Sequence, residues 1–118
     1  MLILIFNFTG RVLSTASTNG VGSDAYFNGI QDILPIDGGR EVLVADLLNH
    51  CIRKVDTQTR VVSTFAGICG RAVPLPDKSS LALKTVLEFP QKIIANEEED
   101  TFYYLLHDRV VKHDILSG

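Results

Sequence analysis

Residues 44–56 read VADLLNHCIRKVD, two short apolar runs on either side of a polar turn. Runs of this length bounded by turn residues are typical of β-strands joined as a hairpin. Asp46 ends the first run, where its carboxylate is expected to accept amide hydrogens of the turn. Asn49 fits this turn because asparagine tolerates the left-handed region of the backbone. The stretch therefore predicts an antiparallel pair of strands.

Arg53 lies inside the second run, and its nearest neighbours on the same face of a strand are Cys51 and Val55. Side chains alternate between the faces of a strand, so the arginine stem is expected to run along an apolar surface. The guanidinium then needs carbonyl or carboxylate partners. Asp46, Asn49 and Arg53 are therefore interpreted as structural residues rather than as ligands of a bound molecule.

Outward from this hairpin, the sequence repeats itself. RVLST at residues 11–15 recurs as RVVST at residues 60–64, which is 49 positions later. KVD at residues 54–56 is similar to KHD at residues 112–114, which is 58 positions later. Self-similarity at such a period is the sequence signature of repeat architectures.

The repeat divides the chain into two units of unequal length. Residues 11–59 form the first unit and residues 60–118 the second. Residues 1–10 are expected to be the end of a preceding unit of the same kind. The greater length of the second unit places an insertion in the loop between residues 67 and 84.

Short runs rich in apolar residues alternate with turn signals along the whole chain, which predicts β-structure. Residues 79–87 allow a short helical turn. Residues 1–6 are interpreted as strand, because a signal peptide would need a basic start and a nearby cleavage site. The expected strands are 2–7, 11–16, 31–36, 41–45, 51–56, 60–66, 91–95, 101–106 and 109–114.

Four strands in each repeated unit are typical of a propeller blade. The expected fold is therefore all-β, with about two blades of four antiparallel strands that form an incomplete β-propeller. A β-sandwich or a simple meander is the alternative.

The stretch at residues 44–56 resembles the NHL repeat, whose pattern places Ala-Asp after an apolar strand, Asn-His in the turn and Ile-Arg-Lys after it. AYFN at residues 25–28 and RVVSTFAG at residues 60–67 are similar to the family's entry segment and outer strand. In the second unit the turn motif has degenerated. The resemblance implies a six-bladed, TolB-like propeller, in which the structural motif residues are Asp46, Asn49, His50, Ile52, Arg53 and Gly67.

The composition is that of a globular chain, with 46% hydrophobic and 21% charged residues among 118. The net charge of −3 disfavours RNA, which some family members bind, and no apolar run reaches the ~20 residues of a membrane span. Cys51 and Cys69 are too few for a disulfide framework and lack metal-ligand spacing. Two free thiols in a reducing compartment are favoured over one bridge, and with them a cytoplasmic location.

No catalytic motif or phosphate-binding glycine loop occurs in the sequence, and His50, His107 and His113 are scattered. No catalytic residue, metal or cofactor is therefore expected. The resemblance implies a non-enzymatic scaffold that binds a protein partner through propeller loops. The alternative is a fragment of a metal-dependent lyase or hydrolase that needs further blades. Two blades leave flanks open, so self-association is also expected.

Overall fold

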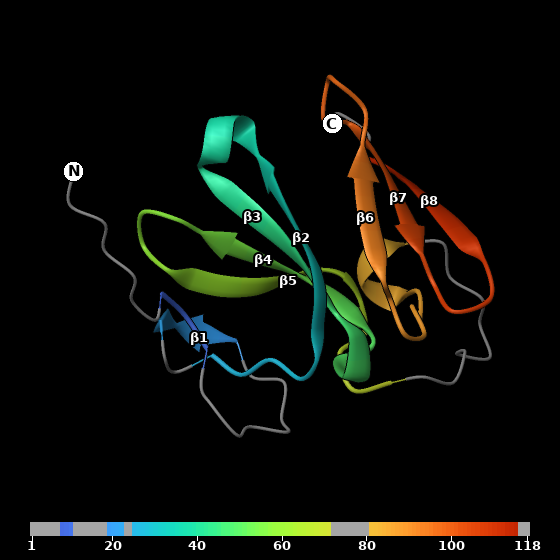
Figure 1. Ribbon diagram of the computed structural model, residues 1–118, viewed down its shortest axis with the longest axis horizontal. Helices are drawn as coiled ribbons and strands as arrows, with labels where there is room; N and C mark the ends of the chain where they lie inside the picture. Colours follow the sequence, from blue (N-terminus) through green and yellow to red (C-terminus); the bar gives the residue numbers. More distant parts are fainter. Residues whose placement is uncertain (1–7, 11–18, 23–24, 72–80, 116–118) are drawn as a thin grey trace.

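In the computed structural model, the chain forms two antiparallel β-sheets (Figure 1). Within the described residues, the first sheet has five strands in the order β1-β5-β4-β3-β2, and the second has three in the order β6-β7-β8. The predicted fold class is confirmed: the chain is all-β, and its sheets lie like neighbouring blades of an incomplete propeller. The structure describes residues 8–10, 19–22, 25–71 and 81–115.

The seven strands expected between residues 31 and 114 are all present, each within one residue of its predicted ends. The short strand β1 is not among the predicted strands, and the strands expected at 2–7 and 11–16 lie outside the described residues. The bounds are β1 Gly20–Val21, β2 Ile30–Ile36, β3 Glu41–Asp46, β4 Cys51–Asp56, β5 Val61–Gly67, β6 Lys92–Ala95, β7 Thr101–Leu105 and β8 Val110–Asp114.

Short 3-10 turns connect several of these strands. The turn η2 (Asp37–Gly39) joins β2 to β3, and Asp37 and Gly38 both have positive φ, a conformation that aspartate and glycine tolerate in turns. The turn η3 (Leu47–Asn49) joins β3 to β4. The turn η4 (Ala82–Lys84) lies where a helical turn was expected.

The sheets are out of phase with the two sequence units. Strand β5 follows the unit boundary at residues 59–60, yet it pairs with β4 and so belongs to the first sheet. The first sheet therefore contains four consecutive antiparallel strands, β2 to β5, with β1 added beside β5. The second sheet has three strands within the described residues.

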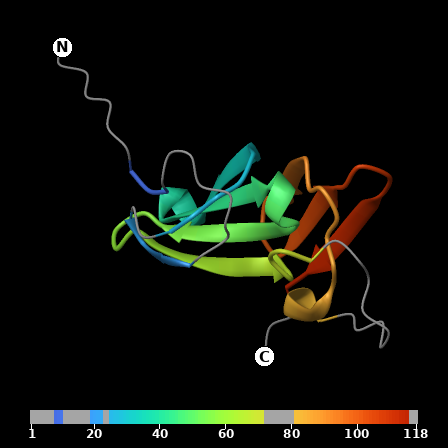
Figure 2. The same cartoon turned by 90° about the horizontal axis from the view of Figure 1, so that it is seen from below.

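The main apolar core lies between the two sheets. From the first sheet it takes Leu43, Ala45 and Ile52, and from the second it takes Phe102 and Tyr104. The ring of Phe65 on β5 meets the ring of Phe102 edge-on at 5.3 Å between centroids. Figure 2 shows the second sheet standing beside the first instead of continuing it. Burial of apolar surface between the sheets is thus what holds them together.

Three polar contacts cross between the sheets and fix their relative position. The amide of Ile93 on β6 donates to Oδ2 of Asp32 on β2 at 2.9 Å. At one end, the amide of Asp37 donates to Oε1 of Glu99 at 2.7 Å. At the other end, the amide of Phe89 donates to Nδ1 of His50 at 3.0 Å.

Candidate functional site

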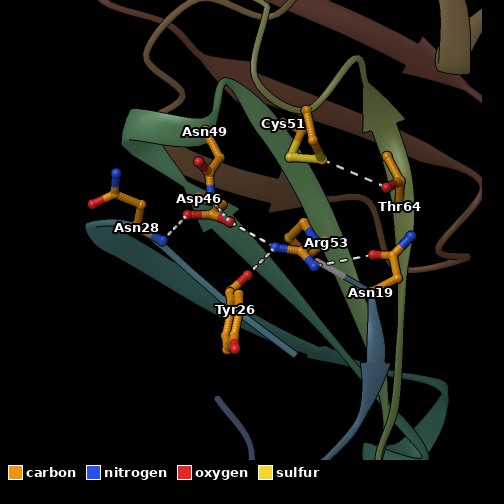
Figure 3. Close-up of a disulfide and its surroundings, with 9 residues drawn as sticks. Asn19, Tyr26, Asn28, Asp46, Asn49, Cys51, Arg53 and Thr64 are labelled. Atoms are coloured by element: carbon orange, nitrogen blue, oxygen red, sulfur yellow. Dashed lines mark hydrogen bonds and ion pairs between the residues drawn. A yellow bond between two sulfur atoms is a disulfide. The ribbon is translucent and has the colours of Figure 1, made fainter. Parts of the chain in front are cut away.

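Arg53 lies on β4 of the first sheet, and its side chain is fully buried, with 0% exposed. Its Nη1 donates to Oδ2 of Asp46 at 2.8 Å and to the carbonyl of Tyr26 at 2.6 Å (Figure 3). Its Nη2 donates to Oδ1 of Asn19 at 3.0 Å. The expectation that this guanidinium would find carbonyl or carboxylate partners is confirmed. The buried arginine therefore joins three separate parts of the chain.

Asp46 completes this network from the end of β3. Its Oδ1 accepts from the amide of Asn28 at 2.7 Å, and its Oδ2 accepts from Nδ2 of Asn49 at 2.9 Å. Of the turn amides that Asp46 was expected to bind, the side-chain amide of Asn49 reaches it, whereas the backbone amides of Leu47 and Leu48 donate to carbonyls of the segment that leads into β2. The backbone amide that Asp46 accepts comes from that same segment, because the sheet brings it against the end of β3.

The entry segment 25–28 encloses the ion pair of Asp46 and Arg53. The ring of Phe27 lies 4.9 Å from the guanidinium carbon of Arg53, at cation–π distance. Residues 25–28 and 44–56 resemble separate parts of the NHL repeat, and in the structure they are in contact. These contacts connect the entry segment to β3 and β4 of the first sheet.

The turn after Asp46 places its left-handed residue one position later than expected. His50 has φ 58° and ψ 44°, whereas Asn49 is the last residue of η3. Asn49 is buried and uses its side chain on Asp46 instead. Histidine is among the residues enriched in this backbone region, so the turn is accommodated without glycine.

The two remaining motif residues are packing positions. Ile52 is fully buried in the core between the sheets. Gly67 ends β5 with φ 89°, and a Cβ there would lie 3.0 Å from the carbonyl oxygen of His50 and 3.1 Å from Cα of Cys51. Only glycine permits that close approach of β5 to the turn.

Cys51 and Cys69 form a disulfide, so the expectation of two free thiols was wrong. The register pairs Cys51 with Gly67, and Cys69 follows two residues later, with 5.0 Å between the cysteine Cα atoms. The amide of Gly70 also donates to the carbonyl of Asn49 at 2.6 Å. The disulfide and this hydrogen bond therefore hold the segment after β5 against the turn that carries His50.

Three connections meet at the end of the molecule that carries η3, the lower end in Figure 1. We call residues 47–50, 87–91 and 106–109 together the rim. The ring of Phe89 packs edge-on with the rings of His50 and His107, at 4.5 and 5.4 Å between centroids. Both sheets thus contribute to one aromatic cluster, which joins two of the three histidines.

Phe89 has a backbone conformation that is unusual for a bulky residue, with φ 49°. The residue is nevertheless 36% exposed. Gly29, 60 positions earlier, also has positive φ, at 75°. The second sheet therefore holds a phenylalanine where the first has a glycine. Sequence reasoning missed Phe89, although the 60-residue shift between the units could have revealed it.

Charged groups surround this aromatic cluster. Nη2 of Arg109 lies 3.0 Å from Oε2 of the largely buried Glu88, and Asp108 is close to both Arg109 and His107. Burial lowers the pKa of His50, while the nearby carboxylates of Glu88 and Asp46 oppose that shift. Since Nδ1 of His50 accepts the amide of Phe89, the neutral imidazole is the form that fits. The rim thus offers an aromatic ring, a neutral imidazole and a charge pair.

His113 lies apart from this cluster, on β8. Its Nδ1 is 2.7 Å from the hydroxyl of Tyr104, beside an open cavity of about 370 Å³ that Leu87 also lines. Burial lowers the pKa of His113 and raises that of Tyr104. Within the described residues, no three His, Cys, Asp or Glu side chains form a metal-binding group. No helix in the same part of the chain is long and apolar enough to cross a membrane.

Comparison with known proteins gives a fold and no family. No protein-family model matches this sequence, and no curated protein matches it. Three crystal structures from Bacteroides thetaiotaomicron VPI-5482 are similar to this chain. A structural genomics protein of unknown function superposes with a TM-score of 0.69 at 21% identity. A putative phosphatase gives 0.66 at 24%, and an auxiliary nutrient binding protein gives 0.62 at 21%.

These similarities extend over most of this chain and a small part of the others. They cover 82–84% of this chain but only 23–25% of those chains. The chain therefore spans about a quarter of the length of the proteins that it matches. At these identities the comparison establishes a shared β-fold and carries no activity across.

Proposed function

We propose that the chain is a non-enzymatic scaffold of the NHL type, which binds a protein partner through the rim. The observation that carries this proposal is Phe89, which is exposed and held with φ 49° between two histidines. Backbone strain at an exposed residue is typical of functional sites, because the surrounding structure must maintain it. Loops on a rigid frame are also where proteins usually bind.

The chemistry of the rim fits a protein surface. Aromatic residues and arginine are enriched at the centres of protein interfaces, and the rim presents Phe89 beside Arg109. The frame behind it is stiff, because the disulfide and the Asp46–Arg53 pair both anchor the turn that carries His50. The binding role of one structural neighbour, the auxiliary nutrient binding protein, is compatible with such a scaffold.

The disulfide bears on where this scaffold works. Disulfides persist in oxidising compartments and are rare where thioredoxin and glutathione keep thiols reduced. We therefore infer that the chain matures in an oxidising compartment, in place of the cytoplasmic location expected from the sequence. A net charge of −3 further supports a protein partner over RNA. Binding to RNA that weakens steeply with added salt would speak against that choice.

The test compares Phe89→Asn with Leu83→Asn in co-purification from extracts of the source cells. Asparagine tolerates positive φ, so Phe89→Asn removes the ring and keeps the backbone. Leu83 is an exposed apolar residue on η4, outside the rim, and serves as the matched control. The proposal expects a partner that both wild type and Leu83→Asn retain and that Phe89→Asn loses. Equal retention by all three proteins would contradict binding at the rim.

A further inference from the structure

Each sheet buries one face in the core between the sheets and turns its other face away. We call these the outer faces. Alternation along the strands assigns the residues to each. The outer face of the first sheet carries Ile33, Val42, Val44 and Val55, and the outer face of the second carries Ile94, Tyr103, Leu105 and Val110.

The two sheets share one register, which makes their faces comparable residue by residue. Ile33 pairs with Val44 on the first sheet, and Ile93 pairs with Tyr104 on the second, in each case 60 positions later. The outer residues Ile33, Val42 and Val44 therefore correspond to Ile93, Phe102 and Tyr104, which are buried in the core.

The correspondence also holds in the opposite direction. Leu34 pairs with Leu43, and the equivalent pair on the second sheet is Ile94 with Tyr103. Leu43 is fully buried between the sheets, whereas Tyr103 is 39% exposed. Each outer face is thus the counterpart of a face that is buried within the same molecule.

The outer face of the first sheet is partly covered by the chain itself. Val44 and Val55 are buried and pack with Phe8 and Phe27. Ile33 is 58% exposed and lines an apolar groove of about 370 Å³ with the same two rings.

The outer face of the second sheet is more open and combines apolar residues with two lysines. Ile94 is 59% exposed, Leu105 40% and Tyr103 39%. Lys92 and Lys112 lie on the same face, because they pair with Leu105 and Tyr103. Exposed apolar surface of this kind marks an interaction site.

We propose that the outer face of the second sheet docks on the outer face of the first sheet of another copy of this chain. The contact continues the arrangement that already joins the two sheets within the chain, because each open face matches one side of that interface. It is a head-to-tail contact between two different patches, unlike a twofold-symmetric dimer. Ile33 on the first outer face and Ile94 on the second both lie outside the rim, so substitutions there test this proposal independently of the proposed function.

The first test is sedimentation of the purified chain over a range of concentrations. The wild type is expected to exceed its monomer mass of 13.0 kDa and to grow with concentration. Ile33→Asp and Ile94→Asp should each abolish most of that association, since each places a charge in the contact. Leu83→Asp, on an equally exposed apolar residue of η4, should associate like the wild type.

The second test separates a head-to-tail contact from a symmetric one. A 1:1 mixture of Ile33→Asp and Ile94→Asp retains one intact outer face of each kind, so a dimer of the two variants should appear. A monomeric wild type, a variant that still associates fully alone, or a mixture that stays monomeric would each overturn the proposal. Circular dichroism checks that each variant is folded, and Ile30→Asp or Val110→Asp replaces a variant that is not.

Discussion

The guanidinium of Arg53 meets the carboxylate of Asp46 where neither group has contact with water. Removal of one partner of such a pair leaves the other as an uncompensated buried charge. Arg53→Met is therefore expected to lower the free energy of unfolding by about 3–5 kcal/mol in urea titrations. Arg40→Met, which breaks the exposed pair of Arg40 with Asp56, should change stability little.

A second variant shows whether the unpaired buried charge of Asp46 causes the loss of stability in Arg53→Met. The double variant Asp46→Asn/Arg53→Met has no buried charge left in the network. It should be more stable than Arg53→Met alone, although less stable than the wild type. If the double variant lost the sum of the two single losses, the pair would not be coupled.

Gly67 and Gly39 allow steric contact to be separated from backbone strain, because both have φ 89°. A methyl group on Gly67 would press on the backbone of His50 and Cys51, whereas nothing lies within 4 Å of the Cβ position at Gly39. Gly39→Ala should cost about 1–2 kcal/mol of unfolding free energy from the left-handed conformation alone. Gly67→Ala should cost clearly more. Equal losses for the two variants would show that the turn at His50 and Cys51 shifts to accommodate the methyl group.

His50 and His113 make stability depend on pH near neutrality. Burial lowers the pKa of both below the ordinary 6.5, so the folded chain holds fewer protons than the unfolded chain. Their contribution is complete above pH 6.5 and is lost as the pH falls through the folded pKa values, by at most about 1.4 kcal/mol per unit for each histidine. The melting temperature should drop between pH 7.5 and 5.5. The double variant His50→Asn/His113→Gln should show a flatter profile.

The disulfide acts on a longer piece of chain, since it closes a loop of 18 residues that contains all of β5. Loss of a bridge across such a loop is expected to cost about 3 kcal/mol, through the greater freedom of the unfolded chain. Cys51→Ala/Cys69→Ala should lower the unfolding free energy by that amount, and so should reduction of the wild type. A thiol reagent should find no free thiol before reduction. Two reactive thiols in the folded protein would contradict the bridge.

The strands were predictable because their signals are local. Residues 41–45 and 51–56 alternate or run apolar between turn residues, and β3 and β4 occupy those positions. The disulfide was not predictable, because it depends on which residue of β5 pairs with Cys51. The same holds for the amide of Asn28 on Asp46, which the sheet brings together across 18 residues.

The candidate site could likewise be predicted only in part from the sequence. The network around Arg53 followed in part from the strand period, which required polar partners for a buried guanidinium. The aromatic cluster at the rim did not follow, because it needs both sheets in place before His50 and His107 reach Phe89. The functional surface is thus a property of the packed pair of sheets rather than of one motif.

The assembled chain depends on two sheets that pack face to face, with their connections gathered at two ends. The rim, the inter-sheet core and the open outer faces all follow from that packing. Stability of a repeat array is the sum of its units and their interfaces, so a further sheet stacked on an outer face would add to it. The stacking of the sheets is therefore the claim on which both proposals rest.

Nuclear Overhauser effects in the isotope-labelled chain test this stacking most directly, with Ile33→Asp used to limit association. The structure predicts contacts of the ring of Phe65, on the first sheet, with the rings of Phe102 and His113 on the second. Backbone contacts should connect β2, β3, β4 and β5 in one series and β6, β7 and β8 in another. Backbone contacts that join β5 to β6 in one continuous sheet, without these ring contacts, would contradict the fold.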